Sequence, residues 1–226
     1  MKTQLLVSVL AAAIAPMSQA AVVTVNQNIH TFLTSPNNIS GLTRDVLFND
    51  GAGNTVTLRF TVTTASGEAF KSLDGGVRVG VGNGSPDWNV IDITEDVAFA
   101  VKYFSHTGTV DLNSIAFRFD SIGFRNFNNV AHNLNWAVNG GSTLTRVAPK
   151  GEFDYALDAS FTTIGAGAGN YSGVFENQNS STTLAGQLSK NTPTTGLKFS
   201  VQFVPEPSSA LLGSLGVLAL LRRRRQ

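Results

Sequence analysis

Most of the chain between residues 21 and 203 alternates apolar and polar side chains with a period of two. One face of segment 55–63 would carry Val56, Leu58, Phe60 and Val62. The same period recurs in segments 77–81, 97–103, 115–119, 134–138, 153–157 and 197–203. Such segments, rich in β-branched and aromatic residues, predict strands with one solvated face, which are typical of antiparallel sheets. We therefore predict an all-β domain over residues 21–203, an antiparallel β-sandwich of the jelly-roll type with about ten to twelve strands.

Local features interrupt this pattern. The alternation changes parity at Asp120-Ser121, which would turn Ile122 and Phe124 the other way and indicates a bulge or a tight corner. Turn-forming residues separate the segments at 83–86, 139–141 and 165–170. Only segment 182–190 has a weak helical pattern.

Residues 1–20 have the organisation of a secretory signal peptide. Lys2 is the only charge, Leu5–Ile14 is an apolar run with one serine, Ser8, and Ser18-Gln19-Ala20 has small residues where signal peptidase reads them. The apolar run would form a helix of about 15 Å, half of a bilayer core, which makes a stable anchor unfavourable. We expect cleavage between Ala20 and Ala21.

Residues 204–226 combine three features in a fixed order. Pro205, Glu206 and Pro207 would end the last strand, since proline offers no N–H to a sheet. Residues 208–221 have no charge and no polar face, and Arg222, Arg223, Arg224 and Arg225 follow in a row. An apolar helix followed by arginines predicts a membrane helix with everything before it outside the cytoplasm. The helix would be only about 21 Å long, so we expect marginal, temporary anchoring.

This tail resembles the PEP-CTERM sorting signal of exopolysaccharide-producing Gram-negative bacteria. The resemblance covers only residues 204–226, and it is supported by the order of the features and by the signal peptide at the other end. It implies that Pro205-Glu206-Pro207 is a processing site for an exosortase, a membrane-embedded enzyme similar to cysteine transpeptidases. The last strand would run directly into Pro205, so the folded body should lie close to the membrane before cleavage.

Composition excludes several classes of function. The chain has no cysteine, which excludes disulfide frameworks, thiolate metal sites and a cysteine nucleophile. The net charge of +1 is too small for a nucleic-acid binder that neutralises phosphates. Lys2 and the four C-terminal arginines are five of the 16 cations, so residues 21–221 carry 11 cations and 15 anions, a net charge of −4. The exported body is therefore expected to be mildly acidic.

The sequence shows no recognisable catalytic motif, and we expect no enzyme activity, no cofactor and no metal site. The histidines His30, His106 and His132 are isolated, and the glutamates of the body are Glu68, Glu95, Glu152 and Glu176. In segment 83–89, Asp87 could supply an oxygen ligand to a calcium ion. Trp88 could stack on a sugar ring, and so could Trp136. Phenylalanine, which lacks a polar tip, supplies 15 of the aromatic residues, so most of these rings should lie in the core.

Three functions remain open. The favoured hypothesis is an exported structural or adhesive protein of the cell surface or extracellular matrix, associated with exopolysaccharide. The second is a carbohydrate-binding module, which would rest on Trp88 and Trp136. The third is a secreted polysaccharide hydrolase or lyase, which needs two carboxylates brought together from different strands, with Glu95 and Glu152 as the residues to test.

Overall fold

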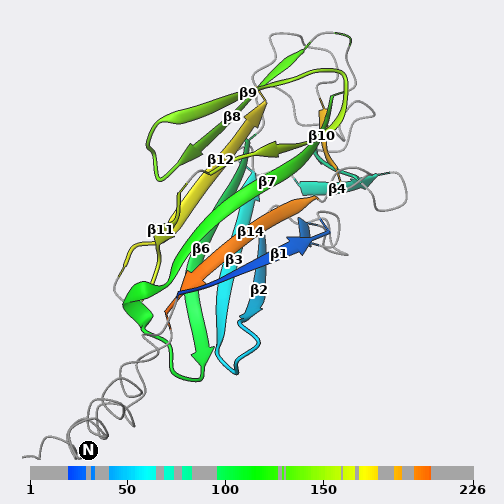
Figure 1. Cartoon of the computed structure of the whole chain (residues 1–226). Coiled ribbons are helices and arrows are strands. Elements are labelled where there is room, and N and C mark those ends of the chain that lie inside the picture. The colour runs from blue at the N-terminus through cyan, green and yellow to red at the C-terminus, as the bar shows by residue number, and fades with distance from the viewer. Residues whose placement is uncertain are drawn as a thin grey trace, which may run out of the picture.

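The computed structural model describes residues 20–28, 32–33, 41–64, 69–73, 78–82, 96–126, 129, 131–158, 160–165, 168–177, 186–189 and 196–204. These residues form two antiparallel sheets packed face to face (Figure 1). The predicted antiparallel β-sandwich is confirmed, whereas its jelly-roll type stays a prediction.

Sheet A has the strand order β1-β14-β7-β13-β5-β4, and β10 and β11 also pair with β7. Its strands are β1 (Ala21–Gln27), β4 (Ala69–Leu73), β5 (Arg78–Gly82), β7 (Ala116–Asn126), β10 (Gly151–Ala156), β11 (Thr162–Thr163), β13 (Gly186–Ser189) and β14 (Leu197–Phe203). Sheet B has the order β2-β3-β6-β12-β8-β9. Its strands are β2 (Gly41–Asn49), β3 (Thr55–Thr64), β6 (Asp96–Thr107), β8 (His132–Val138), β9 (Thr143–Ala148) and β12 (Tyr171–Asn177). A short 3₁₀ helix, η1 (Leu112–Ser114), connects β6 to β7.

The first and last strands of the body lie side by side. The register of β1 on β14 places Ala21 opposite Phe203 and Gln27 opposite Leu197. The start of β1 and the end of β14 therefore meet at one end of the sandwich, as Figure 1 shows.

Phenylalanine supplies most of the largest side chains in the core between the sheets. The largest fully buried side chains are Tyr171 and the phenylalanines at positions 48, 60, 99, 117, 119, 124, 175, 199 and 203. The prediction that most phenylalanines lie in the core is confirmed. The rings pack across the two sheets, for example Phe60 of β3 edge-on against Phe117 of β7 with centroids 5.6 Å apart.

The predicted bulge is confirmed in β7. Phe119 and Ser121 face the adjacent residues Phe199 and Lys198 of β14, so Asp120 is the extra residue. The expectation that Ile122 and Phe124 would point the other way is wrong. The extra residue restores the alternation, and both side chains are fully buried.

Two other expectations concern helices, at residues 182–190 and 208–221. The weak helical pattern at 182–190 does not form a helix at its described residues, because Gly186–Ser189 is strand β13, bonded to β7 and β5. Across the described ranges, no helix has the length and apolar character needed to span a bilayer. The predicted membrane segment 208–221 lies outside those ranges.

Candidate functional site: the end of the last strand

The residue that follows β14 is fastened to the folded body through both of its backbone polar groups. The Val204 N–H donates to Ser114 Oγ at 2.8 Å. The Val204 carbonyl accepts from the Asp111 N–H at 2.9 Å. We call this arrangement of Asp111, Ser114 and Val204 the clasp.

The sequence of η1 explains why the clasp forms. Asp111 caps the helix, because its Oδ1 accepts from the Asn113 N–H at 3.0 Å. Ser114 donates to the Asp111 carbonyl through its N–H at 3.0 Å and its hydroxyl at 2.7 Å. The hydroxyl proton is thus used within the turn, and a lone pair of Oγ is left to accept from Val204. The clasp is a closed ring of hydrogen bonds that requires a hydroxyl at position 114.

A neighbouring loop holds η1 in place from the side. The Ile164 N–H donates to the Ile115 carbonyl at 2.9 Å. A Cβ atom on Gly165 would lie 1.6 Å from the Leu112 carbonyl oxygen, so any other residue would force the two backbones apart. The first glycine of the 165–170 run is therefore required for this close approach.

The clasp can be loosened by one substitution. Ser114→Ala removes the acceptor of the Val204 N–H and a donor to the Asp111 carbonyl. The hydrogen bonds that Ser114 makes to the Val204 N–H and to the Asp111 carbonyl are only partly buried. We therefore expect the free energy of unfolding to fall by about 1 kcal/mol, measured by urea denaturation. Asn113→Ala is the matched control, since the exposed Asn113 side chain takes no part in the clasp, and should change the free energy by less than about 0.5 kcal/mol. Equal effects of the two substitutions would contradict this role of Ser114.

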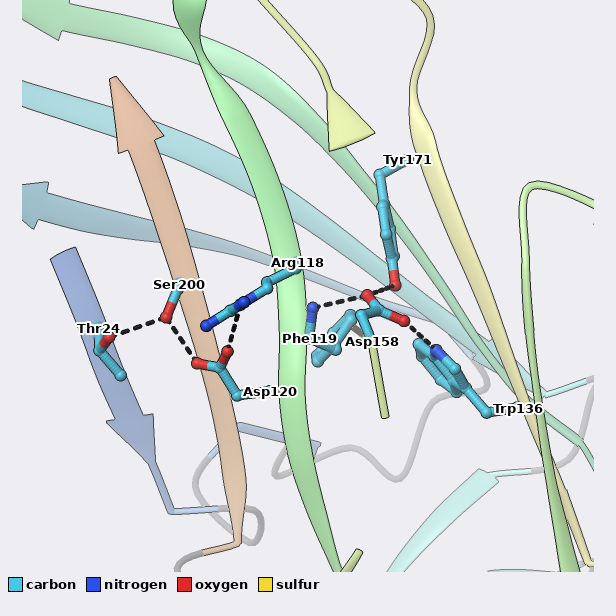
Figure 2. Close-up of polar contacts among 8 residues, drawn as sticks. All are labelled: Thr24, Arg118, Phe119, Asp120, Trp136, Asp158, Tyr171 and Ser200. Carbon is cyan, nitrogen blue, oxygen red and sulfur yellow. Dashed lines mark hydrogen bonds and ion pairs between the residues drawn. The ribbon is translucent and has the colours of Figure 1, made fainter. Parts of the chain in front are cut away.

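A second polar cluster joins the two sheets at Asp158 (Figure 2). Its carboxylate accepts from Trp136 Nε1 at 2.6 Å, from Tyr171 Oη at 2.5 Å and from the Phe119 N–H at 2.9 Å. Burial raises the pKa of Asp158 above its ordinary value, although the three donors oppose this shift. Burial and the neighbouring Asp158 also raise the pKa of Tyr171. This phenol stays protonated and serves as a donor.

On the other side of β7, the bulge residue Asp120 has its own partners (Figure 2). Its carboxylate accepts from Arg118 Nε at 2.7 Å and from the Ser200 hydroxyl at 2.6 Å. The hydroxyls of Ser200 and Thr24 lie 2.8 Å apart. This chain of contacts connects β7, β14 and β1, and so helps to hold the first and last strands together.

The structure places only some of the predicted site residues. Trp136 is in the core, only 2% exposed, with its ring against Phe99 and Phe119. This position favours a structural role over contact with a sugar. Ala20 is exposed, and Ala21 begins β1. The remaining predicted residues lie outside the described ranges: Asp87, Trp88, Pro205, Glu206, Pro207, Arg222, Arg223, Arg224 and Arg225.

Among the described carboxylates, Asp96 and Glu176 form one facing pair, whereas Glu152, His106 and His132 lie elsewhere in the sandwich. Glu176 and Asp96 face each other across β12 and β6 in sheet B, and burial, then Glu176, raises the pKa of Asp96. Glu152 lies in sheet A, opposite Arg125. His132 is buried, and His106 Nδ1 lies 2.6 Å from Tyr103 Oη. Within the ranges that the structure describes, no group of three or more acidic or histidine side chains is placed to share a metal ion.

Sequence reasoning missed the residues of the clasp and Asp158. The pattern Asp111-Leu-Asn-Ser114 is a capping signal that could have indicated η1. No local signal indicates that this turn would meet Val204, or that Asp158 would meet Trp136 and Tyr171.

The clasp lies at the start of a segment that matches a known family model. Residues 203–225 match the model of the PEP-CTERM protein-sorting motif. The chain carries a PEP-CTERM sorting motif. The match begins at Phe203, so the PEP-CTERM motif overlaps the folded body by Phe203, which is fully buried in β14, and Val204, which is held by the clasp. The motif implies an exported protein that is processed by an exosortase at the membrane.

No curated protein sequence matches this chain. Among solved structures, an exo-β-1,3-galactanase from Phanerochaete chrysosporium with galactose is similar at 15% identity and a TM-score of 0.32. A structure of the same enzyme with β-1,3-galactotriose gives 15% identity and a TM-score of 0.30. In both, the similarity covers 72% of this chain and 29% of the other.

Proposed function

We propose that this chain is a structural or adhesive protein of the cell surface or extracellular matrix, associated with exopolysaccharide and without enzyme activity. In this proposal a jelly-roll-type β-sandwich is carried through the inner membrane, anchored for a time by residues 208–221 and released by an exosortase at Pro205-Glu206-Pro207. The observation that carries the proposal is the PEP-CTERM motif joined to the body with no spacer at Val204.

The polar clusters of the body agree with a structural role. Asp158, the carboxylate between the sheets, accepts three hydrogen bonds from groups that belong to β7, β8 and β12. Asp120 connects β7 to β14. Both carboxylates therefore hold strands together. The carbohydrate-binding alternative would rest on Trp88, because Trp136 packs inside the core.

Deleting residues 205–226 tests the sorting step. The truncated chain keeps the signal peptide, the whole sandwich and the clasp, so it should be exported and recovered entirely in the soluble periplasmic or secreted fraction. Cell fractionation measures this, and mass spectrometry of the full-length product should find termini at Ala21 and near Pro205. Membrane association that persists after the deletion would contradict the anchor.

The role after release needs a separate measurement. We expect the mature body to be retarded in a gel containing the host's own exopolysaccharide, and a strain lacking the protein to form a less cohesive matrix. A body that migrates freely, together with an unchanged matrix, would contradict the proposed association.

A further inference from the structure

The PEP-CTERM motif leaves the body at a well-defined end, which we call the Val204 pole. It consists of the start of β1, the end of β14, the turn 49–54, the segment 107–115 and the loop residues 164–165 and 168–170. The parts are bonded to one another, since Asn54 Oδ1 accepts from the Thr109 N–H at 3.1 Å and the clasp joins 111–114 to Val204. Figure 1 shows η1, the end of β14 and the start of β1 at this end.

The tether between the pole and the predicted membrane segment is short. From Val204 to Ser208 the chain can reach about 14 Å at full extension. A six-stranded sheet is roughly 25 Å wide, because neighbouring strands lie about 4.8 Å apart. The body is thus wider than its tether is long. An enzyme that holds Pro205-Glu206-Pro207 must therefore touch the pole, as long as the clasp is closed.

The chemistry of the pole favours a protein surface over a lipid surface. The loops 49–54, 107–115 and 164–170 contain Asp50 and Asp111, but no lysine or arginine. Asp50 is engaged within its own turn by the N–H groups of Ala52 and Asn54. Anionic lipid headgroups attract basic segments, whereas this surface offers small, uncharged, hydrogen-bonding groups and two carboxylates.

We propose that the Val204 pole is a docking surface for the exosortase, which recognises the folded body together with the Pro-Glu-Pro motif. The proposal rests on the proposed function, because it needs the motif to be a processing site. The clasp supplies the rigidity, since it holds the last residue before the motif in one position relative to η1. The enzyme thereby receives its cleavage site in a fixed orientation and only from a body whose last strand has folded.

The test uses the full-length chain in a Gram-negative host that expresses the exosortase. A Gly-Ser-Gly-Ser-Gly-Ser insertion between Val204 and Pro205 leaves the clasp, the motif and the membrane segment unchanged but separates them. The same insertion between Pro149 and Lys150 is the matched control, because it lies at the opposite end of β7, where Gly151 faces Asn126. Pulse–chase labelling measures the rate of C-terminal processing.

We expect the insertion at Val204 to slow processing about tenfold, because a flexible linker removes the advantage of a tethered contact. The control insertion should be processed at the wild-type rate. Equal rates for all three chains would overturn the docking surface and leave the proposed function intact. A wild-type chain that is not processed at all would overturn both.

Asn113→Lys distinguishes the enzyme from the lipid surface. The exposed Asn113 side chain lies on η1 and takes no part in the clasp, so a lysine there adds a cation without opening it. If the pole docks on the enzyme, processing should be slowed. Faster processing together with tighter membrane association would assign the pole to anionic lipid and overturn the proposal.

Discussion

Asp158→Ala is expected to lower the free energy of unfolding by about 3 kcal/mol. The substitution leaves Trp136 Nε1, Tyr171 Oη and the Phe119 N–H without their acceptor. Trp136 and Tyr171 are almost completely buried, so their donors cannot reach solvent easily. The Asp158 position itself is half-buried, and water entering there limits the loss. Urea denaturation of the mature body measures the change.

Two further substitutions show whether the acceptor is responsible. Asp158→Asn keeps the shape but replaces one acceptor oxygen with a donor, which must face one of the three N–H or O–H groups. Its cost should be intermediate, about 1–2 kcal/mol. Asp154→Ala, an exposed acid on β10, should cost less than about 0.5 kcal/mol. If Asp154→Ala costs as much as Asp158→Ala, the effect cannot be attributed to the cluster.

The same variants have an expected pH dependence. Burial raises the pKa of Asp158 above its ordinary value of 3.8, so the folded state binds its proton more tightly than the unfolded state. The contribution of Asp158 to stability is therefore greatest below pH 3.8 and falls as the pH rises through the folded pKa. The stability advantage of the wild type over Asp158→Asn should shrink over that range. An advantage that grows with pH would mean that the three donors outweigh burial.

Phe119→Ala is expected to cost about 3–5 kcal/mol. The Phe119 ring is fully buried at the centre of the core. Its ring contacts are Phe60, Phe99, Phe117, Trp136, Tyr171 and Phe199. They come from β3, β6, β7, β8, β12 and β14, so both sheets would line the resulting cavity. The backbone on both sides of the cavity is held in hydrogen-bonded sheets, which limits its collapse.

Phe104→Ala is the matched control for Phe119→Ala. Phe104 is 46% exposed on sheet B, with the Arg59 guanidinium 3.7 Å above its ring. Removing it should cost less than about 1 kcal/mol. Thermal or urea unfolding of both variants measures the difference, and equal losses would contradict a core centred on Phe119.

The strands that sequence reasoning missed share a physical cause. In β2, Arg44 is at a position in register with the buried Leu42 and Val46, which breaks the apolar alternation. In β12, Gly173 occupies the core face because the Trp136 ring lies over it, where a Cβ atom would come within 2.4 Å. In both strands a position on the core face lacks an apolar side chain, and the local alternation is weakened.

The sequence by itself determined the class of the fold, the phenylalanine core, the bulge at Asp120 and the PEP-CTERM motif. These properties depend on residues close together along the chain, through a period of two, a change of parity or a fixed order of segments. The tertiary structure alone decided that Ala21 meets Phe203, that η1 fastens Val204 and that Asp158 joins three strands. These contacts unite residues far apart in the chain, and pairing of strands and packing of side chains select them only when the two sheets close on each other.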